Sequence, residues 1–461
     1  MTDDRADDPY LIISSDTHAG LPTAEYRPYL DPAYREAFDG FLAKQEAMAE
    51  ARRKFGLENE EFAEEWFGEH EEELRAGWDA SRRDRELDAD GVVGEVIFPD
   101  ADAVAAGTQA PFGAGLGMIG SDYDPELALA GARAHNRWLA ELCRESPERR
   151  RGVIVAPIVG DVAGAVAEIR RAHADGLRGG VMIPSIWGHG QAPYHDACYD
   201  PVWATCAELG LPVHTHVGAA PRDELGAHLG LYITEVTWWS ARPLWFLIWT
   251  GVFERHPDLR FGVTEAGVWW AGNLLWQMDV AFDREHGTRK LASFGEHMRM
   301  RPSEYFDRNC FLGMSTPKRR ELSHRYEVGV GNLLWGNDFP HPEGTWPHTR
   351  EWLVHAFSDI PVDETRAMLG LSAAANYGFD VARLRPHAER IGPRPSDLGQ
   401  DKADTSVWDR ARETGRHWLT GPDVPAVVGA ARKEGAARKE GAARKEGAAR
   451  KEGAARKEGT R

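Results

Sequence analysis

Eight short runs of β-branched and other apolar residues recur along this chain, and helix-like stretches separate most of them. Such alternation predicts parallel strands joined by crossover helices. Eight strands in that order fit a closed (β/α)8 barrel, the TIM barrel of the α/β class, better than an open sheet. The runs are Tyr10–Ser15, Gly94–Phe98, Gly152–Pro157, Gly180–Pro184, Leu211–His216, Arg260–Glu265, Cys310–Ser315 and Val330–Gly336, and the predicted helices include Pro125–Ser146, Ala163–Asp175, Asp200–Glu208 and Trp239–Glu254.

Two segments do not follow the alternation. Residues 21–90 are strongly charged, and we predict a helical insertion between the first and second strands that caps the rim of the barrel. After residue 390 the chain becomes rich in Pro and Asp, and five copies of G-A-A-R-K-E follow from Gly429 to Glu458. A hexad with a glycine and no apolar face cannot bury a core, so we expect a solvated, disordered tail. The predicted units are a barrel over 1–390, an extension over 391–428 and a repeat tail over 429–461.

The composition excludes several classes of protein and partner. With 42% hydrophobic residues over 461 positions, the chain can bury a large core, and disorder of the whole is excluded. A formal net charge of −18 argues against nucleic acid as a partner. The longest apolar run, Pro243–Phe253, is shorter than the roughly 20 residues that a bilayer span needs. The acidic N-terminus also lacks the features of a signal peptide. We therefore expect a cytoplasmic protein without a membrane partner.

Polar residues at the ends of the apolar runs carry the main functional signal, because active sites of such barrels lie at the C-terminal rim. The first run continues into Asp16, Thr17 and His18. Side chains alternate along a strand, so Asp16 and His18 point to the same side, and both can reach one ion. Alone, this D-x-H pattern is a weak signal, because a turn aspartate near a histidine is common.

The fifth and eighth runs end in further side chains that bind metals. His214 and His216 share one face of the fifth run, and His216 lies nearer the rim. His214, one step deeper, is either a satisfied core histidine or a contact of the site. Asp338 follows the eighth run directly. Three strand ends thus supply one rim with the predicted ligands of a divalent metal ion, which are Asp16, His18, His216 and Asp338.

Further side chains near the rim are candidates for catalysis and substrate binding. Glu265 ends the sixth run and is open to three roles: a fifth ligand, a general base or a structural carboxylate. His341 either orients the substrate or exchanges protons, or it is a loop histidine packed on tryptophan. Arg222 is a candidate partner for an anionic substrate, against the plainer interpretation of a surface arginine. Trp269 and Trp346 suggest a flat or apolar substrate.

The most distinctive motifs of the chain are DTHAG, PYHDACYDPVWATCAELGLPVHTHVG, GVFERHPDLRFGVTEAGVWW and LLWGNDFPHPEGTWP. Together they resemble the amidohydrolase-related family, which includes aminocarboxymuconate-semialdehyde decarboxylase and the resorcylate-type decarboxylases. The resemblance covers residues 10–382. It implies a distorted (β/α)8 barrel with one divalent metal ion, often zinc, on Asp16, His18, His216 and Asp338. One position departs from the pattern, because the family's decarboxylases tend to place a catalytic histidine at the end of strand six, where this chain has Glu265.

Two reactions on a small-molecule substrate use this one constellation. A divalent ion lowers the pKa of bound water for hydrolysis, with Glu265 or Asp338 as the base, or it holds a substrate oxygen during decarboxylation. Because Glu265 stands in place of the histidine, we place hydrolysis of a small carboxylated or aromatic metabolite ahead of decarboxylation. Zn2+ is the expected ion, with Mn2+ or Fe2+ as alternatives. A non-catalytic ligand-binding barrel is the third alternative, and a homodimer is left open. The predicted catalytic residues are Asp338, Glu265 and His341.

Overall fold

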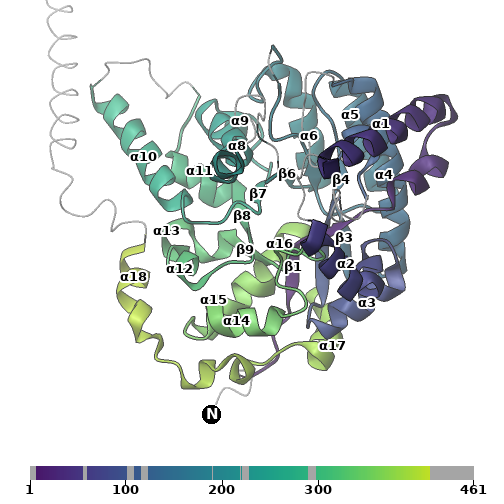
Figure 1. Cartoon of the computed structure of the whole chain (residues 1–461). Coiled ribbons are helices and arrows are strands. Elements are labelled where there is room, and N and C mark those ends of the chain that lie inside the picture. Colours follow the sequence, from purple (N-terminus) through teal and green to yellow (C-terminus); the bar gives the residue numbers. More distant parts are fainter. Residues whose placement is uncertain are drawn as a thin grey trace, which may run out of the picture.

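The structure is a computed structural model that describes residues 7–54, 60–100, 108–115, 123–188, 190–218, 220, 228–288 and 297–415. Its strands form two parallel sheets, one with the order β1-β2-β3 and one that runs from β4 to β9 in sequence order. Figure 1 shows the strands at the centre of the molecule with helices around them. The strands are β1 Ile13–Ala19, β2 Gly94–Pro99, β3 Arg150–Gly152, β4 Ile154–Val155, β5 Val181–Met182, β6 Val213–His216, β7 Phe261–Thr264, β8 Cys310–Ser315 and β9 Leu333–Gly336.

The third predicted strand is divided into two pieces at Val153. The Val153 amide donates to the Ile97 carbonyl of β2. The next amide, of Ile154, donates to the Gly180 carbonyl ahead of β5. One stretch of chain therefore pairs with β2 on one side and with β5 on the other, and it connects the two sheets. The predicted single strand Gly152–Pro157 begins and ends two residues too late, because the two observed pieces together span residues 150–155.

The seam between the first and last strands completes the ring. The His18 amide donates to the Phe339 carbonyl at 2.7 Å, and the Asp338 amide donates to the Asp16 carbonyl at 3.0 Å. These bonds join β1 to the residues that follow β9, so the strands are connected around a (β/α)8 barrel as predicted. β1 begins and ends later than the predicted run Tyr10–Ser15. It extends beyond Ser15 because Thr17 and His18 still pair with β2, after an irregularity in register between Ser14 and Thr17.

Helices form the outer layer of the barrel and the segments at its ends (Figure 1). Their starts follow local signals, since the side chain of Asp124 caps α4 and that of Asp161 caps α5. The predicted helix Trp239–Glu254 is wrong in its bounds, because α8 begins at Leu229 and Gly251, with φ of 72°, precedes α9. The α-helices are α1 Arg35–Lys54, α2 Glu60–Leu74, α3 Ala80–Ala89, α4 Pro125–Glu145, α5 Val162–Ala174, α6 Asp200–Leu209, α8 Leu229–Trp249, α9 Val252–Arg255, α10 Ala271–Thr288, α11 Pro302–Asn309, α12 Arg319–Leu322, α13 Arg325–Val328, α14 Thr349–Phe357, α15 Val362–Arg366, α16 Ser372–Tyr377, α17 Val381–Ile391 and α18 Asp409–Thr414.

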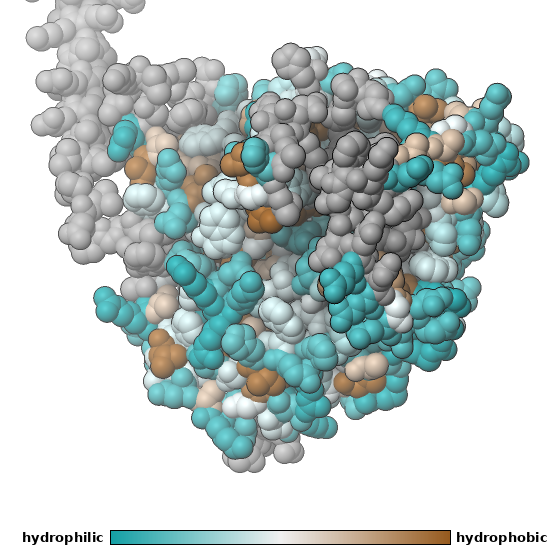
Figure 2. Space-filling view, in the orientation of Figure 1, coloured by the Kyte–Doolittle hydropathy of each residue, from teal (hydrophilic) through white to brown (hydrophobic). Residues whose placement is uncertain are grey.

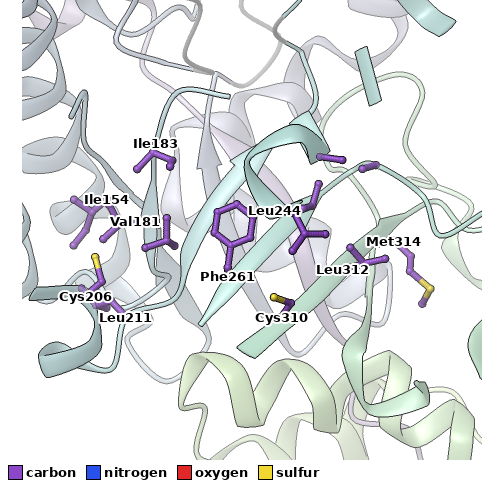
Figure 3. Packing of buried hydrophobic residues seen from close by; sticks show 14 of the residues in the cluster. Ile154, Val181, Ile183, Cys206, Leu211, Leu244, Phe261, Cys310, Leu312 and Met314 are labelled. Carbon is purple, nitrogen blue, oxygen red and sulfur yellow. The ribbon is translucent and has the colours of Figure 1, made fainter. Parts of the chain in front are cut away.

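Apolar side chains cover both faces of the strands. Phe261 of β7, Leu312 of β8 and Leu244 of α8 belong to one buried cluster between strands and helices (Figure 3). Alternate strand residues such as Phe311 and Leu334 belong to a second buried cluster. Because both faces are covered, the strands have continuous apolar sequences. A polar side chain on such a strand is an exception that requires a partner.

The segment after β1 is helical, as predicted, and it contacts both the rim and the strands of the barrel. It contains α1, α2 and α3. Trp66 of α2 packs on Trp346, in the loop after β9, with ring centroids 6.0 Å apart. Arg83 of α3 is fully buried, and its Nη2 lies 2.7 Å from Oε2 of Glu95 on β2. The insertion therefore supports β1 and β2 from outside the barrel.

The C-terminal extension is described only to residue 415, and there it packs on the barrel through contacts such as the Trp408 Nε1 donation to the Asp359 carbonyl at 2.9 Å. The predicted disordered tail over 429–461 lies outside the described residues. Figure 2 shows a mostly hydrophilic surface on the described part of one face, with hydrophobic residues scattered over it. Among the described helices, none is both long and apolar enough to cross a membrane.

Candidate metal centre

Asp16, His18, His216 and Asp338 meet at the C-terminal rim of the barrel. Asp16 and His18 project from β1, His216 is the last residue of β6, and Asp338 follows β9. His18 Nε2 lies 3.4 Å from Asp16 Oδ1 and 3.2 Å from Asp338 Oδ1. His216 Nε2 lies 3.1 Å from Asp16 Oδ1. At most 1% of any of these side chains is exposed, so the structure gathers the predicted ligands in one buried cluster.

The backbone of the rim allows this close approach. β9 passes β1 at Gly336, where a Cβ atom would lie only 2.6 Å from the Cβ of Asp16, so only glycine fits. Beyond the strands, Asp338 has φ of 58° and Glu265 has φ of 61°. Left-handed backbone is uncommon for residues other than glycine and clusters at functional sites, where the surrounding structure holds it.

A main-chain carbonyl fixes the outer nitrogen of each histidine. His18 Nδ1 lies 2.8 Å from the Pro99 carbonyl oxygen, and His216 Nδ1 lies 2.8 Å from that of Val217. Donation from Nδ1 leaves Nε2 as the unprotonated nitrogen of a neutral ring, which is the form that binds metals. Both Nε2 atoms lie against the Asp16 carboxylate.

The cluster also contains buried polar atoms that lack hydrogen bonds. His18 Nε2 and Asp338 Oδ1 have no hydrogen-bond partner among the described residues, although they lie 3.2 Å apart. An unsatisfied buried polar atom costs about 1–3 kcal/mol, so a further partner would stabilise the pair. A divalent cation would satisfy both atoms, and carboxylates with imidazoles form a donor set for such an ion. The residues therefore fit one divalent metal ion.

The carboxyl groups of the cluster differ in charge. Burial raises the pKa of Asp16, but the neighbouring histidines outweigh burial and hold that pKa well below its usual range. The pKa of Asp338 is likewise lowered, chiefly by His341, despite burial. Burial, followed by the charge of Asp338, raises the pKa of Glu265 well above its usual range. The centre thus keeps two anionic carboxylates, while Glu265 favours the protonated form.

Glu265 and His341 border the cluster on its more exposed side. Glu265 Oε2 lies 3.5 Å from His216 Nδ1, and 24% of the Glu265 side chain is exposed. His341 Nδ1 lies 3.0 Å from Asp338 Oδ1, and the His341 ring stacks on His18 at 4.0 Å. These two titratable groups are therefore the ones that a bound molecule would meet first.

The residues predicted to bind the substrate mostly lie outside the cluster. His214 lies deeper in β6, where its Nε2 meets a main-chain carbonyl and its ring stacks on a tyrosine. Trp346 is 5% exposed and packs with aromatic residues of α2 and the rim loop. The predicted substrate contact of these two is not supported, because core packing already uses their rings. Trp269 keeps an exposed ring after β7, and Arg222 lies outside the described residues.

Two features of the site were missed by reasoning from the sequence. Ser315, the last residue of β8, donates its hydroxyl to Asp16 Oδ2. Its place at the end of an apolar run is a signal that could have found it. On the other side of β1, Arg83 donates to the His18 carbonyl at 2.8 Å and so holds the backbone that carries a ligand. No sequence signal marks Arg83, because charged residues on helices usually face solvent.

Comparison with known sequences gives two findings. The chain matches the profile of a family described as amidohydrolase over residues 106–379, more than half of its length. It is also 27% identical over 247 residues to the gamma-resorcylate decarboxylase of Rhodococcus jostii, a match that covers 49% of this chain and 70% of that protein.

Several solved structures share the fold at low sequence identity. A 5-carboxyvanillate decarboxylase of Novosphingobium aromaticivorans with bound manganese is 16% identical, with 80% of this chain and 97% of that chain covered and a TM-score of 0.59. A dihydroxybenzoic acid decarboxylase of a Polaromonas species, also with bound manganese, is 20% identical, with 66% and 87% covered and a TM-score of 0.52. An amidohydrolase of Mycobacterium avium subsp. paratuberculosis is 20% identical, with 67% and 76% covered and a TM-score of 0.54. At these identities the likeness shows the fold.

Proposed function

This chain belongs to the amidohydrolase family, and we propose that it is a metal-dependent decarboxylase of small aromatic carboxylic acids. The observation that carries the proposal is the buried cluster of aspartate and histidine side chains at the C-terminal rim of the barrel. The curated relative is a decarboxylase, which favours the alternative reaction over the hydrolysis that Glu265 had placed first. Both reactions use the same side chains, so the comparison and not the geometry decides the order.

The proposed ligands of the metal are the four buried side chains from the ends of the first, sixth and ninth strands. Asp16, His18, His216 and Asp338 would hold one divalent ion. Carboxylates suit Mn2+, whereas imidazoles suit Zn2+ as well, and two of the similar structures hold manganese. We therefore place Mn2+ beside the expected Zn2+ as the ions to test. When bound, such an ion supplies positive charge that fixes substrate oxygens and stabilises negative charge developing on the ring.

Glu265 is the group best placed to deliver a proton. Its carboxyl group is partly exposed beside His216, and burial favours its protonated form. Decarboxylation requires a proton on the ring carbon that carries the carboxylate. The bond between ring and carboxylate then breaks, its electron pair restores the aromatic ring, and CO2 leaves. Glu265 regains its proton from solvent, while His341, held by Asp338, orients the substrate.

The test is a direct assay of released CO2. Purified protein is supplied with Mn2+ or Zn2+ and is given benzoic acids that carry a hydroxyl group beside the carboxylate. We expect CO2 and the corresponding phenol, which is followed by its ultraviolet absorbance. Hydrolysis of esters or lactones by the metal-loaded protein, without CO2 from any aromatic acid, would contradict the proposal and restore the hydrolase alternative.

A further inference from the structure

A cavity lies at the opposite end of the barrel from the candidate metal centre. Its volume is about 420 Å3. Its walls come from the start of β3, the turns ahead of β5 and β6, and the C-terminal end of α16, where Arg151, Gly176, Leu211 and Tyr377 line it. All of these lie at the N-terminal ends of parallel strands, whereas the metal centre lies at their C-terminal ends. The cavity is therefore separate from the site described above.

The charged side chains on the walls of this cavity are mostly arginines. Two of the five charged side chains that line it are already paired, since Arg150 contacts Asp84 and Asp175 contacts Arg171. The other three are Arg144, Arg151 and Arg178, and none of them forms an ion pair with a carboxylate in the described part of the chain. Such a cluster is unexpected on a chain whose formal net charge is −18.

Arg151 is held in place before any ligand arrives. Its guanidinium donates to the main-chain carbonyls of Pro147, Tyr377 and Gly378 at 2.8, 3.2 and 3.1 Å. It also lies over the Phe379 ring, 4.3 Å from the centroid. Carbonyl oxygens fix the group but do not cancel its charge. A preorganised guanidinium costs little further ordering when it binds an oxyanion.

The like charges in the cavity also destabilise one another. Burial lowers the pKa of Arg151 and the nearby charge of Arg178 lowers it further, whereas Cys143 and Glu148 raise it, and the net pKa is lowered. Burial also lowers the pKa of Arg178, which donates to the Leu177 carbonyl at 2.9 Å. A bound anion would relieve this repulsion, because it supplies the missing opposite charge in a partly desolvated place.

The same cavity offers apolar surface beside the arginines. Ala140, Leu209 and Leu211 line it together with the charged groups. A cavity of this volume is large enough for a small organic molecule. We propose that it binds a small organic anion, with its oxyanion head on Arg144, Arg151 and Arg178 and its apolar part against Ala140, Leu209 and Leu211.

Isothermal titration with benzenesulfonate tests this proposal, because a sulfonate is a poor metal ligand and carries the required apolar ring. We expect saturable binding to the metal-loaded wild type, and about tenfold weaker binding to the double variant Arg144→Gln/Arg178→Gln, a change of one decade in Kd. Arg151 is kept, because its hydrogen bonds support the fold. The control Arg383→Gln/Arg385→Gln removes the same charge from exposed positions of α17 and should bind like the wild type.

Circular dichroism and metal content establish that each variant is folded and loaded. Benzyl alcohol, which has the ring without the charge, should not bind. Equal affinity in the two double variants, or no saturable binding to the wild type, would overturn the proposal. The titration involves no turnover, so its result is independent of whether the chain is a decarboxylase.

Discussion

Two buried charged clusters lie on opposite sides of β1, and they differ in how completely their polar atoms are satisfied. In the outer cluster, Arg83 donates to both carboxylate oxygens of Glu95 and to main-chain carbonyls, so each of its nitrogens has a partner. In the inner cluster, which contains Asp16 and His18, one imidazole nitrogen and one carboxylate oxygen have no hydrogen bond to any described residue. The Arg83 side chain is fully partnered without a ligand, whereas the inner cluster keeps unpartnered atoms on two proposed ligands.

The difference shows what distinguishes a functional site from a structural one in this barrel. Burial and charge are common to both clusters, so neither property alone identifies the site. Unsatisfied buried groups cost free energy, so each of them requires an explanation. The inner cluster retains them, and a metal ion would satisfy them. Removing a side chain from the inner cluster should therefore affect metal binding or turnover, whereas removing one from the outer cluster should affect the stability of the fold.

The largest effect is expected on turnover when the proton donor is removed. Glu265→Gln keeps the shape of the side chain but not its acid, so kcat should fall by about 10²–10⁴, the range for general acid–base groups. Metal content and the unfolding transition should not change. Glu389→Gln, at an exposed position of α17, is the matched control and should keep wild-type turnover. Wild-type turnover by Glu265→Gln would show that Glu265 is not the proton donor.

The next effect is on stability, in the outer cluster. Glu95→Gln leaves the Arg83 charge buried without its counter-charge, and the free energy of unfolding should fall by about 3–5 kcal/mol. Urea denaturation measures the change. The double replacement Arg83→Met/Glu95→Leu removes both charges and should cost less than the single one. A double variant less stable than Glu95→Gln would contradict this expectation. It would mean that the ion pair itself stabilises the fold, beyond the penalty of leaving one charge unpaired.

The contribution of this pair should also depend on pH. Burial raises the pKa of Glu95, but the charge of Arg83 outweighs burial, and the net pKa in the folded protein is lowered. A lowered folded pKa gives stability that is present above the unfolded pKa and is lost as pH falls through the folded pKa. The stability difference between the wild type and Glu95→Gln should therefore shrink in acid. A constant difference down to the folded pKa would contradict this linkage.

A smaller effect is expected from Ser315, which contacts a proposed ligand. Ser315→Ala removes the hydrogen bond to Asp16, and metal affinity should weaken by about 10–100-fold, the usual loss for a group that orients a ligand. Competition with a chelator of known affinity gives the number. Ser323→Ala removes a hydroxyl that bonds the Arg320 carbonyl on α12, and it should leave affinity unchanged. Equal affinities in the two variants would mean that Ser315 does not position Asp16.

The same contrast explains how much could be predicted from the sequence. The inner cluster was predictable residue by residue, because Asp16, His216 and Asp338 interrupt or follow apolar runs where a polar side chain is unexpected. The outer pair was not, because Arg83 and Glu95 look like surface charges until the fold brings a helix of the insertion against β2. The division of the third strand at Val153 depends on its hydrogen bonds to the neighbouring strands on either side, and no local sequence signal predicts it.

The reaction could not be predicted either, because hydrolysis and decarboxylation place the same demands on the same side chains. The sequence put hydrolysis first on the evidence of one residue, Glu265, and the comparison with a decarboxylase favours the alternative. A cytoplasmic location, a homodimer and a domain boundary at residue 390 stay predictions.

Metal content, measured by elemental analysis, tests the central claim most directly. The wild type is compared with Asp16→Ala and His216→Ala, and circular dichroism shows that each is folded. The account predicts one divalent ion per chain in the wild type and in the control Ser323→Ala, but none in Asp16→Ala or His216→Ala. A folded wild type that binds no ion when manganese or zinc is supplied would contradict it.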